Sequence, residues 1–185
     1  MLIIGITGTL GAGKGTIVEY LVKEKGFVHF SVRGFLIEEI ERQGLAVNRD
    51  SMVLVANKLR ADHSPSYIID QLYEQALLTG ANCIIESIRT PGEVESLREK
   101  GNFLLLAVDA DPMLRYDRIV MRNSETDRIS FTTFVENEER EMQSNDPNKQ
   151  NIGKCIEQAD IIFYNNSTVH ELYKRLESEL SQLNF

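Results

Sequence analysis

A glycine-rich stretch near the start of the chain constrains the fold more than any other feature. It reads Gly8-Thr9-Leu10-Gly11-Ala12-Gly13-Lys14-Gly15-Thr16, and it stands directly between the apolar run 2–7 and a helical pattern. Closely spaced glycines let the backbone turn sharply and keep side chains out of the way of a bound group. The stretch therefore predicts a tight turn that joins a buried strand to a helix.

Short apolar runs alternate with helical patterns along the rest of the chain. Several runs are almost continuously apolar, as is typical of strands that are covered on both faces of a sheet. The five predicted strands are 2–7, 27–31, 82–86, 103–109 and 160–165. Helix starts carry capping signals, among them Thr90-Pro91-Gly92-Glu93 and Asp111-Pro112. This alternation predicts an α/β fold with a five-stranded parallel sheet wrapped by helices.

The length and composition indicate one domain over residues 1–185. A chain of 185 residues with 42% hydrophobic side chains can bury a core of its own. Two segments interrupt the alternation: residues 32–80 contain about three helices, and residues 123–150 are polar and charged. The net charge of −8 argues against binding nucleic acid or an anionic membrane through overall charge.

The chain also shows no sign of secretion or of a membrane span. No run approaches 18 apolar residues, and the apolar start lacks the charged flank of a signal peptide. Cys83 and Cys155 have neither metal-ligand nor redox spacing, which fits buried thiols in a reducing compartment. We therefore expect a cytoplasmic protein with a small-molecule partner, and the sequence leaves its oligomeric state open.

The glycine-rich stretch is suited to holding phosphate groups. Backbone N–H groups that converge at a helix N-terminus attract anions, and the positive end of the helix dipole adds to this attraction. Lys14 supplies a charge for the outer phosphates, and Thr16 offers a hydroxyl beside a bridging metal ion. The residues expected to bind the nucleotide here are Gly8, Gly11, Ala12, Gly13, Lys14, Gly15 and Thr16.

The Gly-Lys-Gly-Thr ending resembles the phosphate-binding loop of adenylate kinase and other nucleoside monophosphate kinases. The segments that extend the resemblance are Val28–Gly34, Ile84–Thr90 and Ala159–Ser167, the last also similar to dephospho-CoA kinase. The resemblance implies a three-layer P-loop NTPase fold that binds ATP and Mg²⁺. It further implies a helical acceptor-binding insertion at 32–80 and a short lid at 123–150. The adenine would lie near Arg122 and the loop that contains Asn165 and Ser167.

The same resemblance suggests the metal and acceptor residues. Glu86 stands where the family has an aspartate, and Ser87 where it has a glycine, so Glu86 and Thr16 are the candidate Mg²⁺ residues. Asp109 also ends a predicted strand and is the alternative carboxylate. Arg89 follows a strand end, where open parallel sheets bind ligands, and it is expected to hold an acceptor phosphate together with Arg33. Arg49 and Arg60 are further candidates from the insertion.

Arginines recur on the helix that is expected to begin at Asp111. Arg115, Arg118 and Arg122 share one face of this helix, and Arg128 follows in the polar segment. Arginines that close over a transferring phosphoryl group stabilise its charge, so Arg122 and Arg128 are the preferred lid residues, with Lys14 and Arg89 as further catalytic candidates. The apolar residues of the opposite face are expected to point into the core: Met113, Tyr116 and Val120.

These observations favour an ATP-dependent phosphotransferase. A phosphate acceptor is already ionised and needs arginines, whereas a hydroxyl acceptor needs a carboxylate base. The stretch after the second predicted strand has no acid before Glu38, so a phosphorylated acceptor is favoured, most simply a nucleoside or deoxynucleoside monophosphate. The alternatives are dephospho-CoA kinase, with a hydroxyl acceptor, and a P-loop ATPase or nucleotide-binding switch without kinase activity. The identity of the acceptor stays open.

Overall fold

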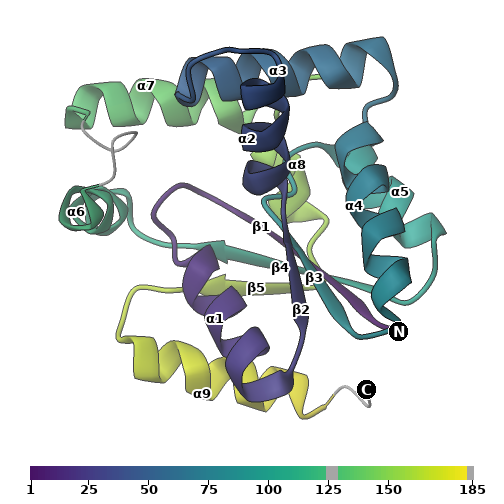
Figure 1. The fold of residues 1–185 in the computed structure, drawn as a ribbon. Coiled ribbons are helices and arrows are strands. Elements are labelled where there is room, and N and C mark those ends of the chain that lie inside the picture. Colours follow the sequence, from purple (N-terminus) through teal and green to yellow (C-terminus); the bar gives the residue numbers. More distant parts are fainter. Residues whose placement is uncertain (124–128, 183–185) are drawn as a thin grey trace.

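The computed structural model describes residues 1–123 and 129–182 (Figure 1). Five strands form one sheet in the order β2-β3-β1-β4-β5, and each neighbouring pair is parallel. The strands are β1 (Ile3–Gly8), β2 (Val28–Ser31), β3 (Cys83–Glu86), β4 (Phe103–Asp109) and β5 (Ile161–Tyr164). Their ends lie within one residue of the predicted ones, so the predicted five-stranded parallel sheet is confirmed.

Helices cover both faces of the sheet, which gives the fold three layers (Figure 1). One face is covered by α1 (Lys14–Lys25) and α9 (Val169–Leu180). The other face is covered by α2 (Val32–Arg42), α3 (Arg49–Asp62), α4 (Tyr67–Thr79), α5 (Pro91–Glu99) and α8 (Ile152–Glu157). The helices α6 (Pro112–Arg122) and α7 (Phe131–Met142) lie beside the loop that follows β1.

The central strand β1 supplies both hydrophobic cores. Side chains alternate between the two faces of a strand. Accordingly, Ile4 and Ile6 pack against α1 and α9, whereas Ile3 packs in the cluster under α2 to α5. All six residues of β1 are buried. This two-sided burial explains why the strand appears in the sequence as an almost continuous apolar run.

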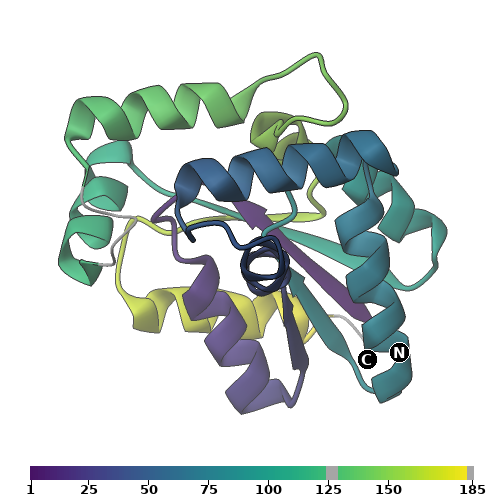
Figure 2. The same cartoon turned by 45° about the horizontal axis from the view of Figure 1, so that its top comes forward.

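The segment 32–80 forms α2, α3 and α4, as the helical patterns predict. Ser31 caps α2 by accepting a hydrogen bond from the backbone N–H of Gly34, and Asn48 and Ser51 form a capping box at the start of α3. Figure 2 shows α2 almost end-on below α3. These helices stand over the end of the sheet at which β2 and β3 finish, where parallel sheets bind their ligands.

The predicted orientation of α6 is wrong. Met113 and Val120 are 55% and 50% exposed, whereas Arg115, which was expected on the outer face, is only 2% exposed. Arg115 is buried because its guanidinium group is fully engaged: it donates to the carbonyls of Ala110 and Leu10 and forms an ion pair with Glu138 of α7. Tyr116 lies between these extremes and packs against two phenylalanines of α7.

The segment 123–150 contains a packed helix as well as loops. In α7, Phe134 and Glu141 are buried, and α7 contacts α8. Arg128, one of the two preferred lid arginines, lies outside the described residues. The role of this segment as a lid therefore stays a prediction.

Candidate active site

The loop between β1 and α1 has a shape that only glycine permits at certain positions. Gly8 has a φ of +134°, and a Cβ atom built on it would lie 2.0 Å from the carbonyl oxygen of Val108. Gly13 has a φ of +110° and is the N-cap residue of α1. Gly15 differs, because a Cβ atom there would meet nothing within 4 Å. The glycines at 8 and 13 thus shape the loop, whereas Gly15 leaves open space in the lining of the cavity described below.

The amine of Lys14 is held inside this loop. Its Nζ donates hydrogen bonds to the carbonyl oxygens of Gly8 at 2.9 Å and Thr9 at 2.8 Å. Desolvation lowers the pKa of Lys14 to about 8, and the positive charge of Arg89 contributes to the same shift. A bound polyphosphate would reverse part of this shift by favouring the charged amine. The free site therefore favours the binding of an anion, which would stabilise the charged form of Lys14.

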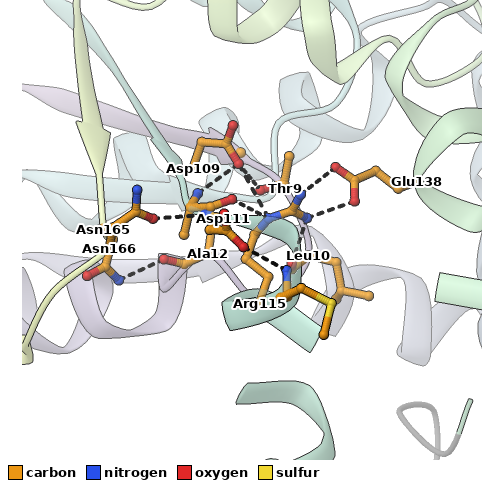
Figure 3. Close-up of polar contacts among 12 residues, drawn as sticks. Thr9, Leu10, Ala12, Asp109, Asp111, Arg115, Glu138, Asn165 and Asn166 are labelled. Carbon is orange, nitrogen blue, oxygen red and sulfur yellow. Dashed lines mark hydrogen bonds and ion pairs between the residues drawn. The ribbon is translucent and has the colours of Figure 1, made fainter. Parts of the chain in front are cut away.

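Hydrogen bonds from other elements hold the loop in place (Figure 3). The hydroxyl of Thr9 donates to Asp109 at the end of β4 at 2.6 Å, and Arg115 donates to the carbonyl of Leu10. The side chain of Asn165, just after β5, donates to the carbonyl of Ala12 at 2.8 Å. The loop is thus tied to β4, α6 and the segment after β5, which keeps its backbone in one shape.

A cavity of about 630 Å³ opens beside the loop. Its walls come from the start of α1, from α2 and α3, from the end of β3, and from α6 and α7. The loop residues in its lining are Leu10, Gly11, Gly13, Lys14, Gly15 and Thr16, whereas Gly8 and Ala12 lie beneath the surface. Of the other predicted site residues, the lining includes Arg33, Arg49, Arg60, Glu86, Arg89, Arg122, Asn165 and Ser167.

One face of α3 forms another wall of the cavity. Its lining residues follow the helical repeat: Arg49, Met52, Val53, Ala56 and Arg60. Together with two apolar side chains of α2, Val32 and Leu36, these residues combine an apolar surface with guanidinium groups at both ends. A ligand with an apolar body and anionic or polar ends matches such a wall.

Two arginines meet at a buried carboxylate on the α7 side of the cavity. Glu141 accepts a hydrogen bond from Arg49 on one oxygen and from Arg89 on the other, the latter at 3.0 Å. Arg89 also donates to the side-chain oxygen of Gln150 at 2.7 Å. Burial would raise the pKa of Glu141, but the charges of Arg89 and Arg49 outweigh it, so that the pKa lies below its usual value. Glu141 is ionised at neutral pH.

A second arginine–glutamate pair lies deeper. Arg60 and Glu93 are 1% and 0% exposed, and Arg60 donates to one oxygen of Glu93 from Nε at 3.1 Å and from Nη2 at 2.8 Å. The other oxygen accepts the backbone N–H groups of Arg89 and Thr90. The capping box predicted at Thr90 is present. Glu93 has a second role beyond this box, because it also links Arg60 of α3 to the backbone N–H of Arg89.

Glu86 and Thr16 are the cavity residues that suit a magnesium ion. Mg²⁺ prefers oxygen ligands and uses one or two carboxylates beside the substrate phosphates. Burial would raise the pKa of Glu86, but the hydrogen bond from His29 and the charge of Lys14 outweigh this, so the carboxylate is ionised. Asp109 binds Thr9 and the backbone of Ala110 and does not line the cavity. The donor set therefore fits Mg²⁺ at Glu86 better than at Asp109.

The residue after Glu86 adopts an unusual backbone conformation. Ser87 has a φ of +74°, in the left-handed region that glycine favours. Its backbone N–H and that of Ile88 both donate to the carbonyl of Ile6, which brings the chain back toward β1. This geometry gives a physical reason for the glycine that the resembling kinases have at this place.

Three residues of the site were not among the preferred candidates from the sequence. Arg118 donates to the backbone carbonyl of Asn165 at 2.9 Å and lines the cavity beside Ser167. Its position on the same helical face as Arg122 was the available signal. Glu141 and Gln150 had no such signal, because they belong to a polar segment in which many side chains are charged, and their partners are distant in sequence.

Comparison with known proteins agrees with this architecture. The sequence profile of the family described as "AAA domain" matches residues 4–144. The chain is 31% identical over 191 residues to UPF0200 protein MmarC7_0527 of Methanococcus maripaludis (strain C7), an alignment that covers 99% of this chain and 98% of the relative. The chain belongs to the UPF0200 family, with an AAA domain over residues 4–144.

Solved structures extend the comparison to the fold. TT1252 from Thermus thermophilus superposes with a TM-score of 0.64 at 20% identity, over 100% of this chain and 98% of that chain. A gluconokinase from Sinorhizobium meliloti 1021 gives a TM-score of 0.62 at 12% identity, over 98% of this chain and 93% of that chain. At such identities the likeness concerns the fold alone. The predicted P-loop α/β fold, shared with kinases, is confirmed.

Two other kinds of site are absent from the described part of the chain. No helix in residues 1–123 and 129–182 combines the length and the hydropathy that a bilayer span needs. In the same residues, no three His, Cys, Asp or Glu side chains gather as a metal site. A magnesium ion that is held mainly by nucleotide phosphates does not require such a group.

Proposed function

We propose that this protein transfers the γ-phosphate of ATP to a small phosphorylated acceptor, most simply a nucleoside or deoxynucleoside monophosphate. The observation that carries the proposal is that several arginines share one cavity with the glycine-rich loop. Arg49, Arg60 and Arg89 line the same cavity as Lys14 and Thr16, and the charge of Arg89 acts on the Lys14 amine. A cavity lined by both a glycine-rich loop and several guanidinium groups suits a donor and an acceptor that both carry phosphate.

Each residue has a role in this proposal. Lys14 and the loop backbone would hold the β- and γ-phosphates, and Thr16 and Glu86 would hold Mg²⁺, which neutralises phosphate charge when it is bound. Arg118, Asn165 and Ser167 would border the adenine. Arg33, Arg49 and Arg89 would bind the acceptor phosphate, and Arg122 and Arg128 would close over the transferring group. The resemblance of the loop to that of nucleoside monophosphate kinases supports these roles. Activity as a nucleoside monophosphate kinase stays a prediction.

A hydroxyl acceptor is the second candidate, and Glu86 is the observation that favours it. Glu86 lines the cavity, is ionised, and stands near Lys14. An ionised carboxylate at such a place can accept the proton of an alcohol. The gluconokinase with a similar fold acts on a substrate with hydroxyl groups, so gluconate and dephospho-CoA belong in any acceptor test.

The decisive experiment measures ADP release from ATP and Mg²⁺ with a panel of acceptors. The panel contains the common nucleoside and deoxynucleoside monophosphates, phosphomevalonate, dephospho-CoA, gluconate and a sample without acceptor. Stimulation by a phosphate monoester supports the proposal, whereas stimulation only by an alcohol favours the second candidate. Acceptor-independent hydrolysis, or binding without turnover, would indicate an ATPase or a switch.

Matched variants connect turnover to the site. Lys14→Ala should lower turnover by about a hundredfold or more, because charge stabilisation of the transferring group is lost. Arg89→Ala should raise the acceptor KM by about tenfold or more, because a charged anion partner is lost. The controls are Lys23→Ala on α1 and Arg140→Ala on α7, both exposed and outside the cavity lining. Near-normal turnover in Lys14→Ala would refute the mechanism.

A further inference from the structure

Glu141 is a buried carboxylate of the cavity to which the proposed function gives no role. Glu141 is 6% exposed, lines the cavity, and lies between Arg49 of α3 and Arg89 of the segment after β3. These arginines are two of the three expected to bind the acceptor phosphate. In this structure a carboxylate of the protein itself therefore occupies their hydrogen-bonding groups.

Arg49, which pairs with Glu141, and Arg60, which pairs with Glu93, have more donors than their carboxylate partners use. Among the residues that the structure describes, the buried Nε of Arg49 and the buried Nη1 of Arg60 find no hydrogen-bond partner. Both residues line the same cavity, and Arg60 is 1% exposed. A buried N–H without a partner is costly, and such groups often indicate a missing ligand. A phosphate monoester has three terminal oxygens against two in a carboxylate, so it can accept more of these hydrogen bonds.

Two anions cannot share the arginines at low cost. A phosphate placed beside an ionised, buried Glu141 would face a like charge within a few ångströms, which disfavours binding. Arg89 already divides its Nη1 between Glu141 and Gln150. Repulsion between the two anions therefore favours departure of the carboxylate when a phosphate pairs with both Arg49 and Arg89.

We propose that Glu141 is an internal competitor of the acceptor, which occupies the anion subsite of Arg49 and Arg89 until an acceptor phosphate displaces it. This inference rests on the proposed function for the identity of the anion as an acceptor. The subsite takes a phosphate monoester dianion, and α7 carries the displaced carboxylate away from α3. Pairing of Glu141 with the two arginines lowers the apparent affinity for the acceptor, because only the fraction of molecules with free arginines binds it.

A structural role for Glu141 predicts the opposite result. If the carboxylate served to position Arg49 and Arg89 for the phosphate, its neutralisation would disorder them and weaken acceptor binding. If it is a competitor, Glu141→Gln frees the arginines and strengthens binding. The sign of the change in affinity therefore separates the two roles.

The test is a calorimetric titration with inorganic phosphate of protein saturated with ADP and Mg²⁺. Glu141→Gln should tighten phosphate binding by about tenfold, within the usual range for coupled sites. The control Glu139→Gln removes the same charge from an exposed position of the same helix and should leave the affinity unchanged. The tighter phosphate binding should disappear in the double variant Glu141→Gln/Arg89→Ala. Its loss would show that the phosphate binds at the subsite of Arg89. Unchanged or weaker binding in Glu141→Gln, or no phosphate binding in any of these proteins, overturns the proposal.

Hydrogen exchange of α7 gives an independent readout. In the wild type, phosphate should increase the exchange of the α7 amides, because it releases Glu141 from α3. In Glu141→Gln the exchange should already be high and should not respond to phosphate. If phosphate instead slows the exchange of the α7 amides in the wild type, displacement of Glu141 is contradicted.

The acceptor panel keeps the two hypotheses distinguishable. If no acceptor stimulates turnover but Glu141→Gln binds phosphate more tightly, the internal competitor is supported and the proposed phosphotransfer fails. If a monophosphate stimulates turnover but its KM rises in Glu141→Gln, phosphotransfer is supported and the competitor role fails.

Discussion

Replacing Arg60 by methionine tests the interpretation of the buried arginine–glutamate pair. Methionine fills a similar volume and cannot donate a hydrogen bond to Glu93. The substitution removes two charged hydrogen bonds, from Nε at 3.1 Å and from Nη2 at 2.8 Å. It leaves a carboxylate that is 0% exposed with only two backbone N–H partners, those of Arg89 and Thr90.

The magnitude follows from this geometry. Breaking a buried ion pair by removing one partner costs about 3–5 kcal/mol, because the remaining charge is uncompensated. Glu93 keeps half of its hydrogen bonds, so we expect the lower end, about 3 kcal/mol. For a chain of this length each kcal/mol lowers Tm by about 2–4 °C, which gives a decrease of roughly 6–12 °C.

The measurement is urea and thermal unfolding followed by circular dichroism, in a double-mutant cycle with Glu93→Gln. Because the two side chains contact each other, their effects should be non-additive, with an interaction of about 2 kcal/mol. Arg98→Met is the control, since Arg98 is 40% exposed and its ion pair with Asp160 should contribute at most about 1 kcal/mol. A cost below about 1 kcal/mol for Arg60→Met, or additive effects in the cycle, would refute the reasoning.

Three further predictions concern the loop and the segment after β3. The pKa of about 8 for Lys14 means that the free folded protein releases this proton above pH 8, which the unfolded chain retains to about pH 10.5. Binding of ATP then takes up a proton, so the affinity for ATP should fall by up to about tenfold per pH unit above pH 8. A constant affinity from pH 7 to 9.5, measured by calorimetry, would contradict this expectation. Gly8→Ala should abolish ATP binding, because its Cβ meets the Val108 carbonyl at 2.0 Å, whereas Gly15→Ala should leave the melting temperature unchanged. Ser87→Val should lower the unfolding free energy by at least about 1 kcal/mol in denaturant titrations, and Ser87→Gly should not lower it, because φ is +74° at this residue.

The elements of the fold could be predicted because their signals are local. A strand that is buried on both faces is apolar along its whole length, and a capping residue lies within three positions of the N–H that it binds. The glycine-rich loop is also a local feature, since it places the phosphate-binding backbone, Lys14 and Thr16 within nine consecutive residues. The strands, the capping box at Thr90 and the position of the loop therefore agree between sequence and structure.

The orientation of α6 could not be predicted from such local signals. Periodicity predicts that the apolar face of α6 points into the core and that Arg115 lies on the opposite face, whereas Arg115 is buried. The deciding partner, Glu138, lies 23 residues further along the chain and reaches Arg115 only after α7 packs beside α6. A buried charge depends on such a partner, and no rule of spacing identifies it.

The same distinction holds for the acceptor side of the cavity. The sequence was sufficient to identify the sheet, its order of strand and helix, and a phosphate-binding loop, because each of these depends on residues that are neighbours in the chain. The pairs Arg60–Glu93 and Arg89–Glu141 join positions 33 and 52 residues apart. Only the packing of α3, α5 and α7 around one cavity brought these charges together, since the energy of a buried ion pair depends on distance in space and on exclusion of water.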